Sequence, residues 1–249
     1  MTGLTIRSRL VVAVGLILLA AAGTATAAAA AGSSSAAAAV VVVRPTQELA
    51  ALLAPHQALS MPAPGSLPVA FVPATRPITA AQTVLPVIGH ARDAAGVPWL
   101  RVRLPGRPNG LTGWIRQRAT VASETGWHIV VKVSSRQVVV YRGGRVVQAF
   151  EAIVGKPSTP TPWGQAFVEE AVDLPVNAAG APFALALSSR STVLQEFAGG
   201  PGQTAIHGVA NIGGELGTAV SHGCIRVAAS TIRWLVARIG PGTPVTVRN

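Results

Sequence analysis

Residues 127–150 read WHIVVKVSSRQVVVYRGGRVVQAF, and this stretch decides the fold class. It contains two runs of β-branched residues, 128–133 and 137–141, which are separated by a short polar turn. Gly143 and Gly144 follow the second run, and a third apolar run comes directly after them. Because glycine reaches the positive φ angles of tight turns, this pair predicts a hairpin. The stretch therefore predicts consecutive antiparallel strands.

The rest of the C-terminal half continues this pattern and adds one helix. Further short β-prone runs lie at residues 164–169, 183–187, 204–207 and 243–247. Near the end of the chain, apolar side chains recur at helical spacing, at Ile232, Leu235, Val236 and Ile239. Ser230 is placed to cap this helix, and Gly240 and Pro241 to end it. Residues 127–248 are therefore predicted to be mainly β, with one C-terminal amphipathic helix.

A smaller β module is predicted over residues 82–122. Residues 99–104 alternate between two faces, with Leu100, Val102 and Leu104 on one of them, which is the pattern of a half-buried strand. A turn rich in proline and glycine separates this strand from another short apolar segment. The order resembles bacterial SH3-like repeats, which implies either wall binding or a packing module without a ligand.

Residues 28–81 are predicted to be a linker. Residues 28–43 contain only Ala, Gly, Ser and Val, which is typical of a tether. A short helical pattern covers residues 47–53, and five prolines between 61 and 78 predict an extended chain. No repeat of fixed period is visible.

The N-terminus indicates export. Arg7 and Arg9 precede an apolar run over residues 10–22, and small residues follow to an Ala-Thr-Ala site at 25–27. This order is typical of a signal peptide over residues 1–27. An uncleaved signal anchor is the alternative, because no charged residue occurs between Arg9 and Arg44. Either way the remainder of the chain is predicted to lie outside the cytoplasm, in the periplasm or cell wall.

Composition narrows the classes of partner. The 249 residues carry a formal net charge of +11. Such a surplus favours anionic partners or surroundings, such as anionic cell-wall polymers. The basic residues are scattered and no nucleic-acid-binding motif occurs, so nucleic acid is not an expected partner. The single cysteine excludes an internal disulfide, and an unpaired thiol in an exported chain is either reactive or paired with another chain.

The cysteine lies in a motif that suits nucleophilic catalysis. Residues 221–226 read Ser-His-Gly-Cys-Ile-Arg, and residues 205–208 read Ala-Ile-His-Gly. Because a thiol is a weak nucleophile at neutral pH, Cys224 needs a base, and His222 or His207 could serve. Spacing alone favours His222, which is nearer. Backbone N–H groups beside glycine could form an oxyanion hole, so the motif predicts acyl transfer through a thioester.

Three other readings compete with this one. A lone cysteine is often a small buried apolar side chain. His207, His222 and Cys224 could instead bind zinc, but Glu215 is the only acid near them and no fourth ligand is evident. A serine hydrolase built on Ser221 would need a G-x-S-x-G elbow, which is absent.

These residues resemble the signature of the L,D-transpeptidase (YkuD-domain) family. The resemblance rests on residues 206–208 and 221–226, on Thr-Pro-Thr-Pro-Trp-Gly at 159–164, and on Gly-Thr-Pro-Val at 242–245, and it spans 127–248. It implies a β-sandwich-like catalytic domain that transfers peptidoglycan stem peptides. The cysteine would release a terminal D-alanine and pass the stem to a side-chain amine, giving a 3→3 crosslink. Neither a metal nor another cofactor is implied.

The same resemblance implies roles for individual residues. Cys224 would be the nucleophile, His207 the proton donor and acceptor, and the Gly208 carbonyl would orient the His207 ring. The oxyanion hole and substrate path would be lined by four further residues, Ser221, His222, Gly223 and Arg226. Ala229 departs from the family, which has Asn or Asp at that position. Use of water or a free D-amino acid as acceptor, and a non-catalytic wall-binding protein, remain alternatives.

Overall fold

The computed structural model describes residues 43–197 and 199–249. The predicted signal segment and the tether up to residue 42 lie outside the described residues. Within the described residues the chain is mainly β, as predicted, with one eight-residue helix. That helix is too short to cross a membrane, and no other helix in this part of the chain could do so.

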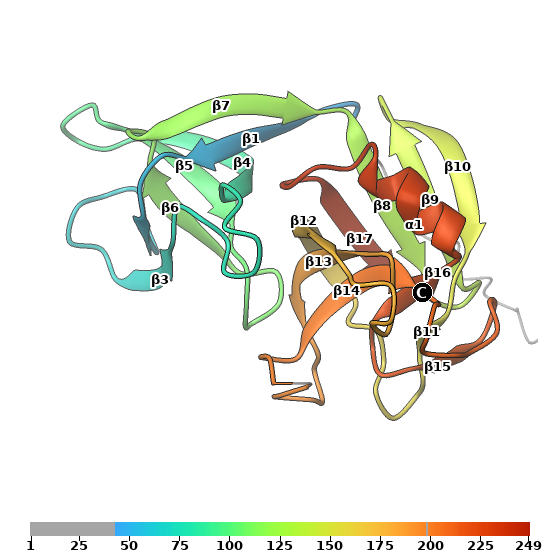
Figure 1. Cartoon of the computed structure of the whole chain (residues 1–249). Helices are drawn as coiled ribbons and strands as arrows, with labels where there is room; N and C mark the ends of the chain where they lie inside the picture. The colour runs from blue at the N-terminus through green and yellow to red at the C-terminus, as the bar shows by residue number, and fades with distance from the viewer. Residues whose placement is uncertain (1–42, 198) are drawn as a thin grey trace, which may run out of the picture. The chain divides into compact units, whose positions relative to one another are not determined.

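Seven strands form the first sheet, in the order β3-β2-β6-β5-β4-β1-β7 (Figure 1). The strands are β1 (Gln47–Leu52), β2 (His56–Leu59), β3 (Pro68–Val72), β4 (Val84–Arg92), β5 (Pro98–Arg103), β6 (Thr112–Arg116) and β7 (Thr120–Thr125). All their pairings are antiparallel. Aliphatic side chains from six of these strands, β1 to β6, form a core on one face of the sheet, and Phe167 from the second half of the chain joins it.

The linker and the short helix predicted before residue 82 are wrong where this sheet forms. Residues 47–52 are strand β1, which pairs with β4 on one side and β7 on the other. Leu49 and Leu52 are buried there, so tertiary pairing overrides the local helical pattern. Pro68 is compatible with β3 because it begins an edge strand, where a missing N–H is tolerated. The strand predicted at 99–104 is confirmed as β5.

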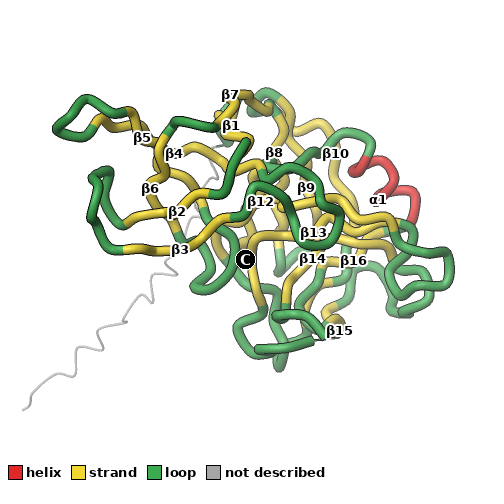
Figure 2. The backbone as a smooth tube through the Cα atoms, turned by 60° about the vertical axis from the view of Figure 1, so that its left-hand side comes forward, coloured by secondary structure: helices red, strands yellow, loops and turns green. Residues whose placement is uncertain are grey.

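Eight strands form the second sheet, in the order β10-β9-β8-β17-β12-β13-β14-β16 (Figure 2). The strands are β8 (Trp127–Lys132), β9 (Gln137–Arg142), β10 (Arg145–Glu151), β12 (Gly164–Asp173), β13 (Phe183–Arg190), β14 (Gln203–Gly208), β16 (Ile225–Val227) and β17 (Pro244–Arg248). A separate short pair consists of β11 (Val154–Gly155) and β15 (Ala219–Ser221). The predicted hairpin is confirmed: Gly143 and Gly144 have φ angles of 59° and 76° between β9 and β10.

Helix α1 (Ala229–Val236) closes the core of the second sheet. Ile232 and Leu235 are fully buried in that core, as the helical spacing predicts. The Trp234 ring meets the rings of Trp127 and Phe150 edge-on, at centroid distances of 6.1 and 5.5 Å. The predicted cap at Ser230 is wrong: the helix begins after Ala228, which makes no side-chain capping bond.

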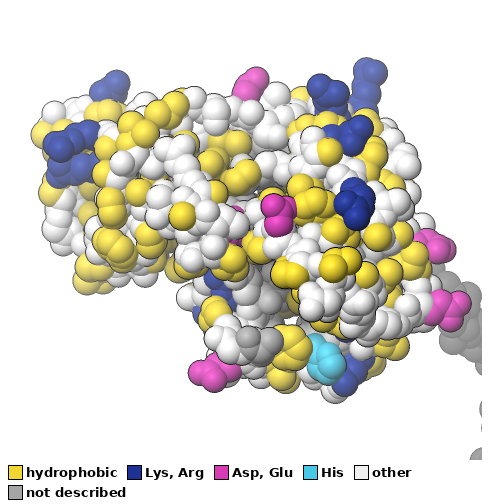
Figure 3. All heavy atoms as spheres, in the orientation of Figure 1, with side chains coloured by type: hydrophobic (Ala, Val, Ile, Leu, Met, Phe, Trp, Pro, Cys, Tyr) yellow, Lys and Arg dark blue, Asp and Glu magenta, His cyan; other side chains and the backbone are white. Residues whose placement is uncertain are grey.

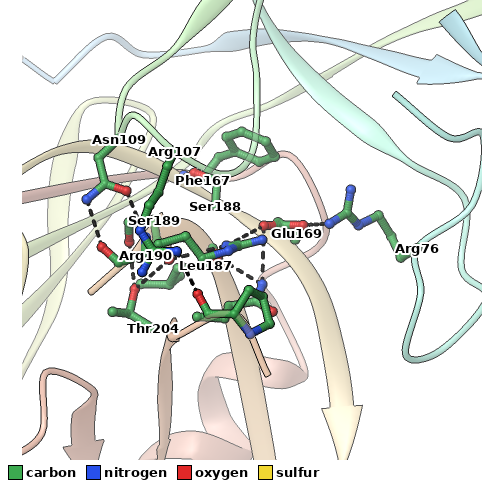
Figure 4. A network of polar contacts seen from close by, with 12 residues as sticks. Arg76, Arg107, Asn109, Phe167, Glu169, Leu187, Ser188, Ser189, Arg190 and Thr204 are labelled. Carbon is green, nitrogen blue, oxygen red and sulfur yellow. Dashed lines mark hydrogen bonds and ion pairs between the residues drawn. The ribbon is translucent and has the colours of Figure 1, made fainter. Parts of the chain in front are cut away.

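Buried charges join the two sheets, as Figure 4 shows. Glu169 on β12 is paired with Arg76, from the loop after β3, and with Arg190 at the end of β13. The neighbouring Glu170 accepts hydrogen bonds from the backbone N–H and the hydroxyl of Thr79, at 2.9 and 2.7 Å. Buried charges are tolerated only when paired, so these contacts fix how the loop after β3 meets β12.

The basic side chains on one face of the molecule stand apart from one another. On the face drawn in Figure 3, Lys and Arg stand in separate groups, with acidic side chains between them. The net charge of the chain therefore does not produce a continuous basic patch on this face.

Candidate active site

The parallel pairing of β14 and β16 brings the two predicted catalytic residues together. In this register Ile206 lies beside Ile225, and His207 beside Arg226. Both isoleucines are fully buried in the core. Because side chains alternate along a strand, His207 and Arg226 point to the opposite face, and so does Cys224, two positions before Arg226. His207 and Cys224, which are seventeen positions apart in the sequence, therefore lie on the same face of two paired strands.

A backbone carbonyl fixes the orientation of the His207 ring. Nδ1 of His207 lies 2.8 Å from the carbonyl oxygen of Gly208. A carbonyl can only accept, so Nδ1 carries the proton and donates it, and Nε2 keeps a free lone pair. The ring is buried and is therefore available as a base through Nε2 alone. Sequence spacing favoured His222, but the geometry gives these properties to His207.

The turn between β12 and β13 packs directly against this histidine. A Cβ placed on Gly180, whose φ is +87°, would lie 2.4 Å from Nδ1 of His207. A Cβ on Gly208 would lie 2.0 Å from the carbonyl oxygen of Ala181. The N–H of Gly208 also donates to the carbonyl of Gly180, at 2.8 Å. The two glycines therefore let the turn and the strand touch, and the turn holds the ring in place.

Ser221 organises the turn that presents Cys224. Its hydroxyl donates to the carbonyl of Cys224 at 2.6 Å and accepts from the N–H of Gly223 at 3.2 Å. Ser221 is fully buried, so its hydroxyl shapes this turn and does not reach a substrate. Gly223 has a φ of +113°, which the turn requires and which L side chains rarely adopt. Its N–H is occupied by Ser221 in this geometry.

A second segment supports the same turn from behind. The carbonyl of Ser221 accepts from the N–H of Lys156 at 3.0 Å and from the hydroxyl of Thr159 at 3.2 Å. A Cβ on Gly223 would lie 3.3 Å from the carbonyl oxygen of Pro160. The Thr-Pro-Thr-Pro-Trp-Gly segment singled out in the sequence is therefore packed under the cysteine turn.

Burial favours the uncharged forms of His207 and Cys224. It lowers the pKa of His207, and the nearby Arg226 lowers it further, against the hydrogen bond to Gly208, which raises it. Burial likewise raises the pKa of the Cys224 thiol, although a backbone hydrogen bond with Ala205 and the charge of Arg226 oppose that rise. Cys224 as a whole residue is partly exposed. Both pKa shifts favour the uncharged thiol and the uncharged imidazole at neutral pH.

His222 occupies a different position from His207. It is exposed, and its ring stacks on Phe197 at a centroid distance of 5.6 Å. Phe197 belongs to the loop between β13 and β14. The sequence offered no signal for Phe197 or for Gly180, because each acts through a contact between distant segments.

The first sheet holds the base of that loop. Arg107, in the loop between β5 and β6, donates to the carbonyls of Ser191, Leu194 and Pro201 at 2.9–3.0 Å. Asn109 bonds the N–H and the carbonyl of Arg190, at 2.7 and 2.8 Å (Figure 4). The loop that carries Phe197 to the cysteine turn is therefore fixed by the other sheet.

Arg226 is the buried cation of the site. Its Nη1 donates to the carbonyl of Gly213 at 3.1 Å, while its Nε has no hydrogen-bond partner. Among the described residues, no group of three His, Cys, Asp or Glu side chains could hold a metal ion. The arrangement offers a thiol, an oriented base and a fixed positive charge, which suit attack on a carbonyl.

Comparison with known proteins gives a family match for the part of the chain that carries these residues. Residues 126–247 match the family of L,D-transpeptidase catalytic domains named YkuD. No match was found among curated proteins. The SH3-like resemblance of residues 82–122 gained no support and stays a prediction.

Solved structures similar to the chain include three L,D-transpeptidases. The C442S mutant from Enterococcus faecium is 22% identical over 49% of this chain and 49% of its own, with a TM-score of 0.39. The enzyme from Mycobacterium smegmatis is 19% identical over 61% and 90%, with a TM-score of 0.38. L,D-transpeptidase 3 from Mycobacterium tuberculosis, in complex with a faropenem-derived adduct, is 18% identical over 67% and 91%, with a TM-score of 0.42. The chain thus spans about half the length of the Enterococcus faecium protein.

Proposed function

Since the chain carries a catalytic domain of the YkuD L,D-transpeptidase family, we propose that it is a peptidoglycan L,D-transpeptidase in which Cys224 is the nucleophile and His207 the base. The orientation of His207 by the Gly208 carbonyl, on the same face of β14 and β16 as Cys224, is the observation that carries the proposal. Such an enzyme acts on the cell wall, in keeping with an extracytoplasmic location.

The first half of the reaction is acylation. Nε2 of His207 takes the thiol proton, and the sulfur of Cys224 attacks the carbonyl that joins the diamino acid of a tetrapeptide stem to its terminal D-alanine. The negative charge on the carbonyl oxygen is stabilised by backbone N–H groups of the turn. Because the N–H of Gly223 is bonded to Ser221, we assign the main donor role to Cys224 itself. The C–N bond then breaks, His207 returns the proton to the leaving amine, and D-alanine departs.

The second half transfers the acyl group. The side-chain amine of another stem attacks the thioester carbonyl, and Nε2 of His207 takes a proton from that amine. The C–S bond breaks, an amide bond forms as a 3→3 crosslink, and the proton passes to the sulfur. If water attacks instead, the product is a trimmed stem, so carboxypeptidase and transpeptidase activity share every residue of the site.

Mass spectrometry of the products tests the proposal. Purified protein is incubated with tetrapeptide-stem muropeptides, and 3→3 dimers and released D-alanine are measured. Cys224→Ala should abolish both, because no other residue in the site can carry the acyl group. If the wild-type protein forms no more 3→3 dimer and releases no more D-alanine than Cys224→Ala, the proposal is wrong.

Thiol chemistry separates the enzyme from a non-catalytic wall-binding protein. A catalytic Cys224 should form one stable adduct with a carbapenem, seen as a mass increase of the intact protein, and Cys224→Ala should form none. A merely structural cysteine would stay unmodified until the protein is denatured.

A further inference from the structure

A cavity of about 240 Å³ lies between the first and second sheets, separate from the cysteine site. It is bordered by Arg44, which precedes β1, by Arg103 at the end of β5, and by His128 on β8. Gln165 on β12 and Thr246 on β17 complete its polar wall. The volume is several times the roughly 30 Å³ that one water molecule occupies in the liquid. The cavity is therefore large enough for a polar group of several heavy atoms.

The positive charges of this cavity have no acidic counterpart. None of the residues that line it is Asp or Glu. Within residues 43–197 and 199–249, the side chains of Arg44 and Arg103 make neither a hydrogen bond nor an ion pair. By contrast, the buried Arg76 and Arg190 are both paired with Glu169. Like charges held close together without a counter-ion are unfavourable, so the cavity is electrostatically incomplete.

The pKa values of two lining residues, Arg103 and His128, are lowered. Burial and then the charge of Arg101 lower the pKa of Arg103. Burial and then the charge of Arg103 lower the pKa of His128 to about 4. In both cases the charged neighbour is a cation, and no carboxylate offsets it. Both shifts therefore agree with the geometry of the lining.

Two linked hydrogen bonds leave the side-chain NH₂ group of Gln165 as a further donor in the cavity. Nε2 of His128 lies 2.8 Å from the hydroxyl oxygen of Thr246, and that hydroxyl donates to Oε1 of Gln165 at 3.1 Å. Since the hydroxyl proton goes to Gln165, the oxygen accepts from His128. Oε1 of Gln165 is thereby occupied, and its NH₂ group is left as the available end. Two guanidinium groups and one amide NH₂ thus offer donors without a matching acceptor.

We propose that this cavity binds a phosphate group. Guanidinium groups bind phosphate through paired, charge-assisted hydrogen bonds. A tetrahedral phosphate has enough acceptor oxygens for donors from three chain segments, whereas a carboxylate has only two oxygens. Free inorganic phosphate and the phosphodiester of an anionic wall polymer share this chemistry. The surplus charge of +11 favours such polyanions.

Binding measurements on the full chain test this site without any need for catalysis. Inorganic phosphate and a glycerol phosphate oligomer are titrated by calorimetry at constant ionic strength, since exposed charges are screened by salt. Arg103→Ala should weaken binding about tenfold or more, because it removes a charge-assisted pair. Arg103→Lys keeps the charge but loses the planar fork, so it should give an intermediate affinity.

Arg92→Ala is the matched control. Arg92 lies on β4, donates to the carbonyl of Gly96, and does not border the cavity. Its replacement by alanine changes the net charge by the same amount as Arg103→Ala but leaves the cavity intact. If Arg103→Ala proves unstable, Arg44→Ala at the exposed mouth of the cavity replaces it. Tighter binding of the oligomer than of phosphate identifies a polymer as the source, and equal binding identifies the free ion. Absence of saturable binding of either probe, or equal weakening by Arg92→Ala, overturns the proposal. An inert enzyme that still binds phosphate would count against the proposed function alone.

Discussion

The two sheets of this protein differ in how well their strands can be predicted from the sequence. In the second sheet, β8, β9 and β10 are consecutive hairpin partners, so glycine turns and β-branched runs identify them locally. In the first sheet, β1 lies between β4 and β7, and its partners come from distant parts of the chain. Alternating burial is weak in such short strands, and prolines surround them. Distant pairing therefore hid β1, while β2 and β3, which pair with each other, were hidden by their short length and by the prolines around them.

The sheets also divide the functional work. The second sheet supplies Cys224, His207 and Arg226 from its β14 and β16 edge. The first sheet supplies none of these, but its loop between β5 and β6 fixes the loop that carries Phe197. Three kinds of substitution test how far the two sheets act as one unit. They change the buried charges around Glu169, the turn over His207, and the contacts of Arg107 with the loop between β13 and β14.

The largest effect is expected from breaking the charges that join the sheets. Glu169→Gln removes the negative charge between Arg76 and Arg190 and leaves both cations buried. Removal of one partner from a buried ion pair costs about 3–5 kcal/mol of the free energy of unfolding. Chemical denaturation measures this loss. Glu124→Gln, at an exposed position on β7, should change the free energy of unfolding little, and an equally small effect of Glu169→Gln would contradict the buried pairing.

A large effect on catalysis is expected at the turn over His207. Gly180→Ala would force a Cβ to within 2.4 Å of Nδ1, so the ring must move. Misplacement of a catalytic group by about 1 Å can cost about 100-fold in rate, so kcat/KM should fall by about that factor. Gly96→Ala, in the first sheet, is the matched control: its φ is +77°, but a Cβ there meets nothing within 4 Å. Equal kcat/KM of the two variants would contradict the expected role of the contact between Gly180 and His207.

A smaller effect is expected from releasing the clamp between the sheets. Arg107→Ala removes three hydrogen bonds to the loop between β13 and β14, and kcat/KM should fall about tenfold while the fold is kept. Amide hydrogen exchange should rise in residues 191–202. Arg92→Ala should change neither quantity. If Arg107→Ala leaves exchange in this loop unchanged, the two sheets do not act together.

The smallest change concerns pH. His207 must be neutral to act as a base, and burial lowers its pKa below the ordinary 6.5. The acid limb of the acylation rate should therefore have its midpoint below pH 6.5, as the imidazole becomes protonated. Because burial raises the pKa of Cys224, alkylation by iodoacetamide without substrate should accelerate only in the alkaline range. An acid limb centred above 6.5 would indicate a different base.

The resemblance to a family signature indicated Cys224, His207 and Gly208, whereas spacing alone favoured His222. In the structure the Gly208 carbonyl orients the His207 ring, and β14 and β16, which carry the two motifs, pair side by side. The role expected of Ser221 changed, because its burial became visible only in three dimensions. Gly180, Phe197 and Arg107 could not be found in the sequence, since each acts through a contact across many residues.

The sequence by itself determined the mainly β fold and the helix with Ile232 and Leu235 on its buried face, and it singled out Cys224 as the candidate nucleophile. These features depend on local periodicity and on the chemistry of single side chains. Only the tertiary structure decided that residues 47–72 form strands of a sheet, that a backbone carbonyl orients the ring of His207, and that Arg44 and Arg103 line one cavity. Strand pairing, burial and charge balance depend on residues far apart in the chain, which no local pattern records.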